Sequence, residues 1–247
     1  MLQNPHIKNF YNNIIADKYK DDYEYNRWFR TARLWLDYSM TYRAIKHHLG
    51  KVVFTRALEI GPGPGTWTRL LHRQTPNAKL DLVDISEEMY QQFLLEGRGG
   101  FPNVNYYVRD FATFDSKGKN YDFIFSCRAL EYFDDKPAFF KKCAALLKEG
   151  GRGLIITKNP GYAFWRHGGK SFQHGGQVAP QQMRGLLEKH GFSHIEIYPV
   201  VVRVPLLDRL TFALAEKIFL NTFTKPFKIS LNRFVESYAV VFEKWKS

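Results

Sequence analysis

Apolar and polar positions alternate with two different periods along the middle of the chain. Short apolar segments that end at polar or turn residues predict strands at 56–60, 79–84, 104–108, 121–126, 154–157, 194–201 and 237–242. Helical spacing between them predicts helices at 66–73, 138–147 and 180–190. Ser86, followed by Glu87 and Glu88, is a typical start for another helix. This alternation favours a parallel sheet with helices on both faces.

The segments that flank this alternation have other patterns. Residues 11–50 have Trp, Leu and Ile at helical spacing and end at Gly50, so we expect one or two helices ahead of the sheet. Residues 161–176 are rich in Gly and His and lack periodicity, which indicates a loop or lid. Residues 206–223 are apolar but contain Asp208, Arg209, Glu216 and Lys217, too many charges for a transmembrane helix. They predict an amphipathic helix between the last two strands.

These elements together predict one fold class. We expect a Rossmann-like, doubly wound α/β fold with a mostly parallel seven-stranded sheet, N-terminal helices and a helical insertion before the last strand. The chain length of 247 residues fits a single domain. Within it we expect a helical cap at 1–50, a cofactor-binding core at 51–160, and the lid, last strands and inserted helix at 161–247.

Charge and composition narrow the partners and the compartment. The net charge of +12 favours anionic partners such as nucleic acid, lipid headgroups or acidic small molecules, although a solvated basic surface explains it equally well. Lys225 and Lys228 follow the amphipathic segment, so peripheral membrane contact is an alternative to packing on the domain itself. Two cysteines are too few for a disulfide framework, and the first ten residues lack the layout of a signal peptide. We therefore expect a cytoplasmic protein, and the oligomeric state stays open.

A glycine-rich segment after the first strand carries the main chemical signal. Gly61, Gly63 and Gly65 alternate with other residues, which lets the backbone turn sharply and approach a ligand. Asp84 ends the next strand about 20 residues later, where an acid meets ribose hydroxyls in nucleotide-binding units. Glu59 just before the glycines would repel the pyrophosphate of NAD, whereas S-adenosylmethionine carries an ammonium, a sulfonium and no phosphate. The charges therefore favour S-adenosyl-L-methionine as the cofactor.

The chain resembles the class I methyltransferase family, particularly its small-molecule branch of the type 11 kind. Segments that are similar to the family's ordered motifs lie at 58–65, 82–86, 108–111, 121–132 and 147–154. The resemblance implies that Asp84 holds the ribose, that Asp110 reaches the adenine amino group, and that residues 126–129 approach the methionine portion. The cofactor-binding residues implied are Glu59, Gly61, Gly63, Gly65, Asp84, Ile85, Met89, Asp110, Phe111, Ser126 and Arg128.

The candidates for catalysis are Glu131, His167 and His174. Glu131 is either a general base or a surface acid, and the surface role is slightly favoured. Each histidine lies in the expected lid and has an ordinary pKa near neutrality, although a lone loop histidine is more often solvated. Arg128 is either a ligand for an anionic substrate or cofactor carboxylate, or a surface residue. We expect no metal ion, because no cluster of oxygen ligands or of Cys and His is evident.

The predicted function is methyl transfer from S-adenosylmethionine to a small, largely apolar acceptor. The reaction is an in-line displacement, in which the protein aligns the nucleophile with the S–C bond and excludes water. The expected acceptor is lipid-like or quinone-like, because the segments that would cover the site are aromatic and apolar. Two alternatives stay open. One is an RNA methyltransferase, in keeping with the positive charge, and the other is a non-catalytic regulatory subunit that binds the cofactor.

Overall fold

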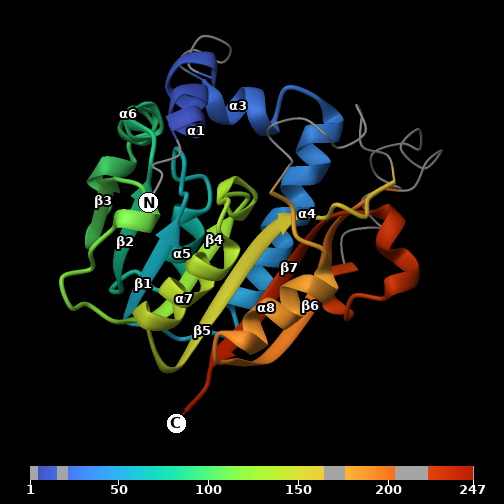
Figure 1. The fold of residues 1–247 in the computed structure, drawn as a ribbon. Helices are drawn as coiled ribbons and strands as arrows, with labels where there is room; N and C mark the ends of the chain where they lie inside the picture. Colours follow the sequence, from blue (N-terminus) through green and yellow to red (C-terminus); the bar gives the residue numbers. More distant parts are fainter. Residues whose placement is uncertain (1–4, 16–21, 164–175, 204–221, 247) are drawn as a thin grey trace.

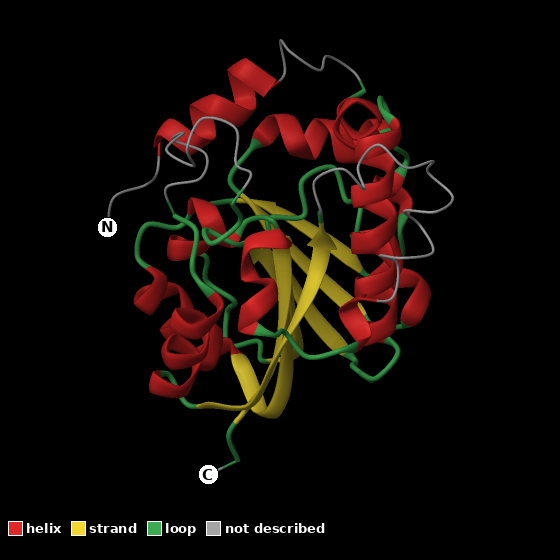
Figure 2. Cartoon of the chain, turned by 90° about the vertical axis from the view of Figure 1, so that its right-hand side faces the viewer, coloured by secondary structure: helices red, strands yellow, loops and turns green. Residues whose placement is uncertain are grey.

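The computed structural model describes residues 5–15, 22–163, 176–203 and 222–246. Within these residues a seven-stranded sheet lies between two groups of helices (Figures 1 and 2). The strand order is β3-β2-β1-β4-β5-β7-β6. The strands are β1 (Arg56–Ile60), β2 (Lys79–Asp84), β3 (Val104–Val108), β4 (Tyr121–Cys127), β5 (Leu147–Lys158), β6 (Phe192–Val202) and β7 (Val235–Lys244). Only β7 runs antiparallel to its neighbours, which confirms the predicted mostly parallel, Rossmann-like sheet.

Helices cover both faces of the sheet, as the alternating pattern predicted. They include α4 (Ala32–Leu49), α5 (Thr68–Gln74), α6 (Glu87–Leu95), α7 (Lys136–Leu146) and α8 (Pro180–Lys189). Figure 1 shows α7 and α8 on one face, with α4 and α5 on the other. Ser86 starts α6 as predicted, because its Oγ accepts a hydrogen bond from the Met89 N–H at 3.2 Å. No helix in the described part of the chain is both long and apolar enough to cross a bilayer.

The last three strands are longer than predicted, and the boundaries of two helices differ from the sequence prediction. The glycines at 150 and 151 were expected to end a helix at Leu147, but α7 already ends at Leu146 and β5 begins at Leu147. Gly150 instead adopts a left-handed φ of 69° inside the long strand, which lets the strand bend without ending. α5 begins at Thr68 rather than at residue 66, because the chain is still turning through residues 61–67.

The N-terminal segment lies over the carboxyl ends of the parallel strands (Figure 1). It contains α1 (Pro5–Asn9), a π-helical segment (Phe10–Ile15) and α3 (Tyr23–Trp28). Asn12 joins it to the core, because its Oδ1 accepts a hydrogen bond from the Ser86 hydroxyl at 2.6 Å. The predicted inserted helix falls mostly on residues 204–221, which lie outside the described residues.

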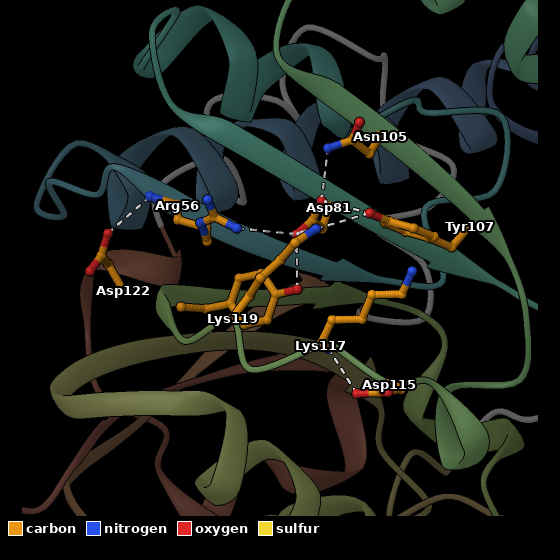
Figure 3. Close-up of polar contacts among 9 residues, drawn as sticks. Arg56, Asp81, Asn105, Tyr107, Asp115, Lys117, Lys119 and Asp122 are labelled. Atoms are coloured by element: carbon orange, nitrogen blue, oxygen red, sulfur yellow. Dashed lines mark hydrogen bonds and ion pairs between the residues drawn. The ribbon is translucent and has the colours of Figure 1, made fainter.

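The amino-terminal half of the sheet contains a closed polar cluster around Asp81, shown in Figure 3. Asp81 is 1% exposed and accepts hydrogen bonds from the Tyr121 hydroxyl at 2.9 Å and the Asn105 amide at 3.0 Å. Lys119 Nζ lies 3.4 Å from the carboxylate, and Arg56 lies 3.9 Å from it. A buried carboxylate needs such partners to offset its lost hydration, so this cluster binds neighbouring strands to each other.

Candidate active site

A cavity of about 850 Å³ lies at the carboxyl ends of β1, β2 and β4. Open α/β sheets bind their ligands at these ends, because the loops there diverge from the sheet. The N-terminal segment forms another wall, to which it contributes Ile7, Tyr11, Tyr23, Arg27 and Trp28. Most of the lining side chains are apolar or aromatic, so the cavity suits a ligand with extensive apolar surface.

The three glycines of the loop after β1 have left-handed φ values but different surroundings. A Cβ at Gly61 would lie 2.4 Å from the Ala129 Cβ, and one at Gly65 would lie 2.7 Å from the Phe93 ring. A Cβ at Gly63 would meet nothing closer than the Met89 sulfur at 3.8 Å, an ordinary contact. Gly61 and Gly65 are therefore required by the protein's own packing, whereas Gly63 faces the cavity.

Asp84 joins two of the loops that line the cavity. Its carboxylate accepts hydrogen bonds from the Gly63 N–H at 2.9 Å and the Ser86 N–H at 3.0 Å. The surrounding protein excludes water and raises the pKa of Asp84, although these backbone hydrogen bonds act in the opposite direction. The carboxylate thus fixes the glycine loop against the start of α6 and faces the cavity at the same time.

Glu59 lies behind the glycine loop rather than in the cavity wall. It is 2% exposed, and the Thr68 hydroxyl donates to its Oε2 at 2.7 Å. Burial raises the pKa of Glu59 to about 8, and the hydrogen bond from Thr68 and the charge of Arg98 only partly oppose that rise. Burial therefore favours the protonated form of this carboxyl group.

The end of β3 and the start of α6 form the apolar part of the cavity. Ile85, Met89 and Phe111 all line it, and Met89 and Phe111 are almost fully buried. Asp110 is half-buried, and its Oδ1 accepts a hydrogen bond from the Ala112 N–H at 2.8 Å. Lys142 Nζ lies 5.1 Å from the centre of the Phe111 ring. This arrangement can hold a flat heterocycle against apolar side chains, with an acid at its edge.

The loop that follows β4 brings a cation to the cavity. Arg128 has a left-handed φ of 64°, and its Nε donates to Glu131 Oε1 at 3.1 Å. The other oxygen of Glu131 accepts a hydrogen bond from the Thr157 hydroxyl on β5 at 2.9 Å. Arg128 lines the cavity with a side chain that is 15% exposed, and Glu131 lies behind it. Glu131 therefore fixes the guanidinium in place and is not itself open to a ligand.

The part of the chain that forms most of the cavity matches a known protein family. Residues 57–151 match the family described as a methyltransferase domain. Malonyl-[acyl-carrier protein] O-methyltransferase 1 of Ilyobacter polytropus is 36% identical over 100 residues, which is 40% of this chain and 37% of that protein. Trans-aconitate 2-methyltransferase of Variovorax paradoxus is 31% identical over 96 residues, 39% of this chain and 36% of that protein. Residues 57–151 therefore form a domain of the class I, S-adenosylmethionine-dependent methyltransferase kind.

Solved structures share the fold over nearly the whole chain. Magnesium protoporphyrin IX methyltransferase from Synechocystis, with bound S-adenosylhomocysteine, has a TM-score of 0.65 and 16% identity, covering 98% of this chain and 99% of that one. A methyltransferase from Archaeoglobus fulgidus has a TM-score of 0.63 and 18% identity, covering 94% and 98%. The Ilyobacter and Variovorax proteins match a shorter part of this chain. The matched region is also little more than a third of each relative's own length.

Most of the cofactor residues predicted for a class I methyltransferase meet in the cavity. Those that line it are Gly61, Gly63, Asp84, Ile85, Met89, Asp110, Phe111 and Arg128. Glu59, Gly65 and Ser126 do not, and Ser126 instead donates to the Ile60 carbonyl at 2.9 Å from a buried position. The roles of these residues in cofactor binding stay predictions.

The structure corrects the interpretation of Glu131 and leaves two other catalytic candidates untested. Glu131 was slightly favoured as a surface acid, but it is 4% exposed, because the loop after β4 folds it against Thr157. His167 and His174 lie outside the described residues. Burial raises the pKa of Cys127, which keeps its thiol protonated, in line with the packing role expected of it. No group of His, Cys, Asp or Glu in the described ranges is arranged to hold a metal ion.

Several cavity residues of this methyltransferase were not singled out from the sequence. Tyr11 and Tyr132 both line the cavity, and their hydroxyls are hydrogen-bonded at 3.0 Å, which joins the N-terminal segment to the loop after β4. Arg27 and Trp28 on α3 also line it. For Tyr11 and Trp28 the only sequence signal is the aromatic content of residues 11–50, which does not indicate where that segment packs.

Proposed function

We propose that this methyltransferase transfers the methyl group of S-adenosylmethionine to a carboxylate oxygen of a small, largely apolar acceptor. The observation that carries the proposal is the guanidinium of Arg128, which is held at the carboxyl end of β4 in a mostly apolar cavity. A planar guanidinium matches a carboxylate better than any other side chain does. The cation therefore supplies the specificity, and the apolar walls bind the rest of the acceptor.

The proposed cofactor position follows the loops of the cavity. Asp84 would bind the ribose, the adenine would lie against Met89 and Phe111 with Asp110 at its edge, and the methionine portion would lie near Gly63. The residues present fit this group, because Gly63 leaves open the space that a larger side chain would fill. Glu59 would lie behind the positive end of the cofactor, which would favour its ionised form.

A carboxylate acceptor also needs no general base, which fits the engaged state of Glu131 and the protonated state of Cys127. A carboxylate is already ionised at neutral pH, so its oxygen attacks the methyl carbon directly and the S–C electron pair returns to sulfur. Both oxygens of Glu131 are engaged by Arg128 and Thr157, and Cys127 is protonated. The protein then has to align the acceptor and exclude water. His167 and His174 are not needed for this reaction.

Two of the relatives support the same chemistry by name. The Ilyobacter and Variovorax proteins are named for malonyl and trans-aconitate acceptors, and both acceptors carry carboxylates. A malonyl thioester and trans-aconitate are therefore the first acceptors to test.

The proposal is tested by methyl transfer from labelled S-adenosylmethionine to four acceptors: a malonyl thioester, trans-aconitate, a phenol and bulk RNA. A methyl ester releases labelled methanol in mild alkali, whereas ethers and methylated amines keep the label. We expect alkali-labile label in the carboxylic acids. Arg128→Gln should raise the acceptor KM about 100-fold, as expected for losing a buried charge-assisted contact.

Arg152→Gln is the matched control, because Arg152 also pairs with a glutamate but lies away from the cavity. It should leave the acceptor KM unchanged. Alkali-stable label in the phenol or in RNA would overturn the carboxylate proposal and favour another acceptor class. Tight S-adenosylmethionine binding without transfer to any pool would favour the regulatory alternative.

A further inference from the structure

Glu24 on α3 lies at the centre of a second buried charge cluster, on the side of the glycine loop that faces away from the cavity. It is 5% exposed and binds two arginines, Arg69 on α5 at 2.6 Å and Arg98 just after α6. Arg98 is itself 3% exposed. Glu24 therefore supplies the counter-charge of one buried and one partly buried cation, and Arg98 has a second, longer ion pair with Glu96 at 3.5 Å.

Each of these arginines also holds a carbonyl group of the glycine loop. Arg98 donates to the Pro64 carbonyl, and Arg69 Nε donates to the Thr66 carbonyl at 3.1 Å. Pro64 and Thr66 flank Gly65, whose missing side chain makes room for the Arg98 stem. Two parallel connections thus run from Glu24 through an arginine to the backbone of the loop. The connection through Arg98 is buried and the one through Arg69 is partly buried, so a shift of the loop displaces the charges that hold α3.

The same helix supplies part of the cavity wall. Tyr23, Arg27 and Trp28 of α3 line the cavity, while Glu24 points to the arginines. Trp28 packs edge to face on Trp67, which follows the loop, with ring centres 5.4 Å apart. α3 therefore touches the loop through Glu24 and Trp28, and it also encloses the space next to Arg128 and Tyr132.

We propose that Glu24 is a positioning residue that couples cofactor binding in the glycine loop to closure of α3 over the acceptor end of the cavity. The inference rests on the proposed function, since it takes the cavity to hold S-adenosylmethionine and an acceptor. A cofactor that fixes Gly63 and its neighbours also fixes the carbonyls of Pro64 and Thr66, and through the arginines it favours the closed position of α3. Linkage requires the reverse as well, so closed α3 raises the affinity for the cofactor by the same factor.

The test measures hydrogen exchange of the amides at 23–28, with and without S-adenosylhomocysteine, in the wild type and in Glu24→Gln. In the wild type the ligand should slow this exchange about tenfold. In Glu24→Gln that ratio should fall toward one, and the affinity for S-adenosylhomocysteine should fall by the same factor. A purely structural role would speed exchange in both states and leave the ratio of free to bound rates unchanged.

Asp81→Asn is the matched control, because it also removes a buried carboxylate that faces two cations, but in a cluster whose printed contacts include no residue of α3 (Figure 3). It should lower the melting temperature and keep the tenfold protection. If Glu24→Gln does not fold, Arg69→Lys replaces it in the test. Lysine keeps the positive charge but cannot donate to Glu24 and to the Thr66 carbonyl at the same time. It should lose a substantial part of the protection.

The outcomes separate the two proposals. Protection of 23–28 that is equal in the wild type and in folded Glu24→Gln overturns the coupling and leaves the proposed function standing. Failure of the wild type to bind S-adenosylhomocysteine overturns both. Loss of protection with unchanged ligand affinity also contradicts the coupling, because linkage requires both to change.

Discussion

Asp81 and Asp84 lie three residues apart on β2, but they are held in different ways. Asp81 accepts hydrogen bonds from side chains on β3 and β4 and faces two cations, so the protein encloses it completely (Figure 3). Asp84 is held by the backbone N–H groups of two loops and is only partly buried, beside the cavity. The carboxylate of Asp81, in the amino-terminal half of β2, thus joins strands to each other. The carboxylate of Asp84, at the carboxyl end of β2, instead fixes the loops that line the cavity.

The largest expected effects come from removing the negative charge of Asp81 or that of Asp84. Asp81→Asn should lower the free energy of unfolding by about 3 kcal/mol, because it leaves partly buried cations without their counter-charge. Asp84→Asn should raise the Kd for S-adenosylmethionine about 30-fold, in line with the loss of a charge-assisted hydrogen bond of roughly 2 kcal/mol. Urea unfolding and calorimetric titration measure the two effects.

The comparison predicts that each substitution leaves the other property nearly intact. Asp81→Asn should bind the cofactor within a factor of three of the wild type at a temperature where it is folded. An unchanged Kd in Asp84→Asn would show that the ribose is not bound at the end of β2. A large loss of affinity in Asp81→Asn would show that the two ends of the strand are not independent.

Two glycines with similar backbone angles allow the same comparison on a smaller scale. Gly63 has a φ of 56° at the cavity, and Gly150 has a φ of 69° in β5 away from it. Alanine at either position should cost about 1 kcal/mol of stability, since an L side chain is strained in the left-handed region. At Gly150 the new Cβ would lie near only the flexible end of Lys246.

The two variants should differ in cofactor binding. Gly63→Ala places its methyl group toward the ligand and should weaken S-adenosylhomocysteine binding about tenfold, whereas Gly150→Ala should bind normally. Thermal melting and titration of both variants provide the measurement. If Gly63→Ala keeps full affinity in the folded protein, the glycine loop is a structural turn and not a cofactor cradle.

The sequence predicted those strands and helix caps that depend on the local pattern of residues. β1, β2 and β3 have the predicted bounds, and Ser86 caps α6, because period and capping chemistry act within a few residues. Contacts between distant residues were not predicted. Glu131 was placed on the surface because its partner Thr157 comes 26 positions later. Glu24 and Arg98 meet across 74 positions, and no local pattern marks either residue.

The ends of the strands should also respond to pH with opposite signs. Asp122, at the start of β4, accepts hydrogen bonds from Thr55 and Lys148, and these lower its pKa to about 2. A carboxyl whose pKa is lower in the folded state stabilises the fold above its unfolded pKa, near 4, and loses that contribution as the pH falls toward 2. Between about pH 2 and pH 4, the free energy of unfolding should therefore increase less in Asp122→Asn than in the wild type.

Glu59, at the end of β1, should give the reversed effect. Its pKa of about 8 exceeds the unfolded value of 4.5, so the folded state holds more protons and stability falls as the pH rises between these values. The stability of Glu59→Gln relative to the wild type should therefore increase from pH 5 to pH 8. Asp37 and Lys158 have pKa values near 7, so they also titrate in this range. Their contribution is the same in both proteins, so the difference in free energy of unfolding between Glu59→Gln and the wild type at each pH reports on Glu59. Urea unfolding across this range measures it, and a difference that stays constant with pH would mean that Glu59 is ionised throughout.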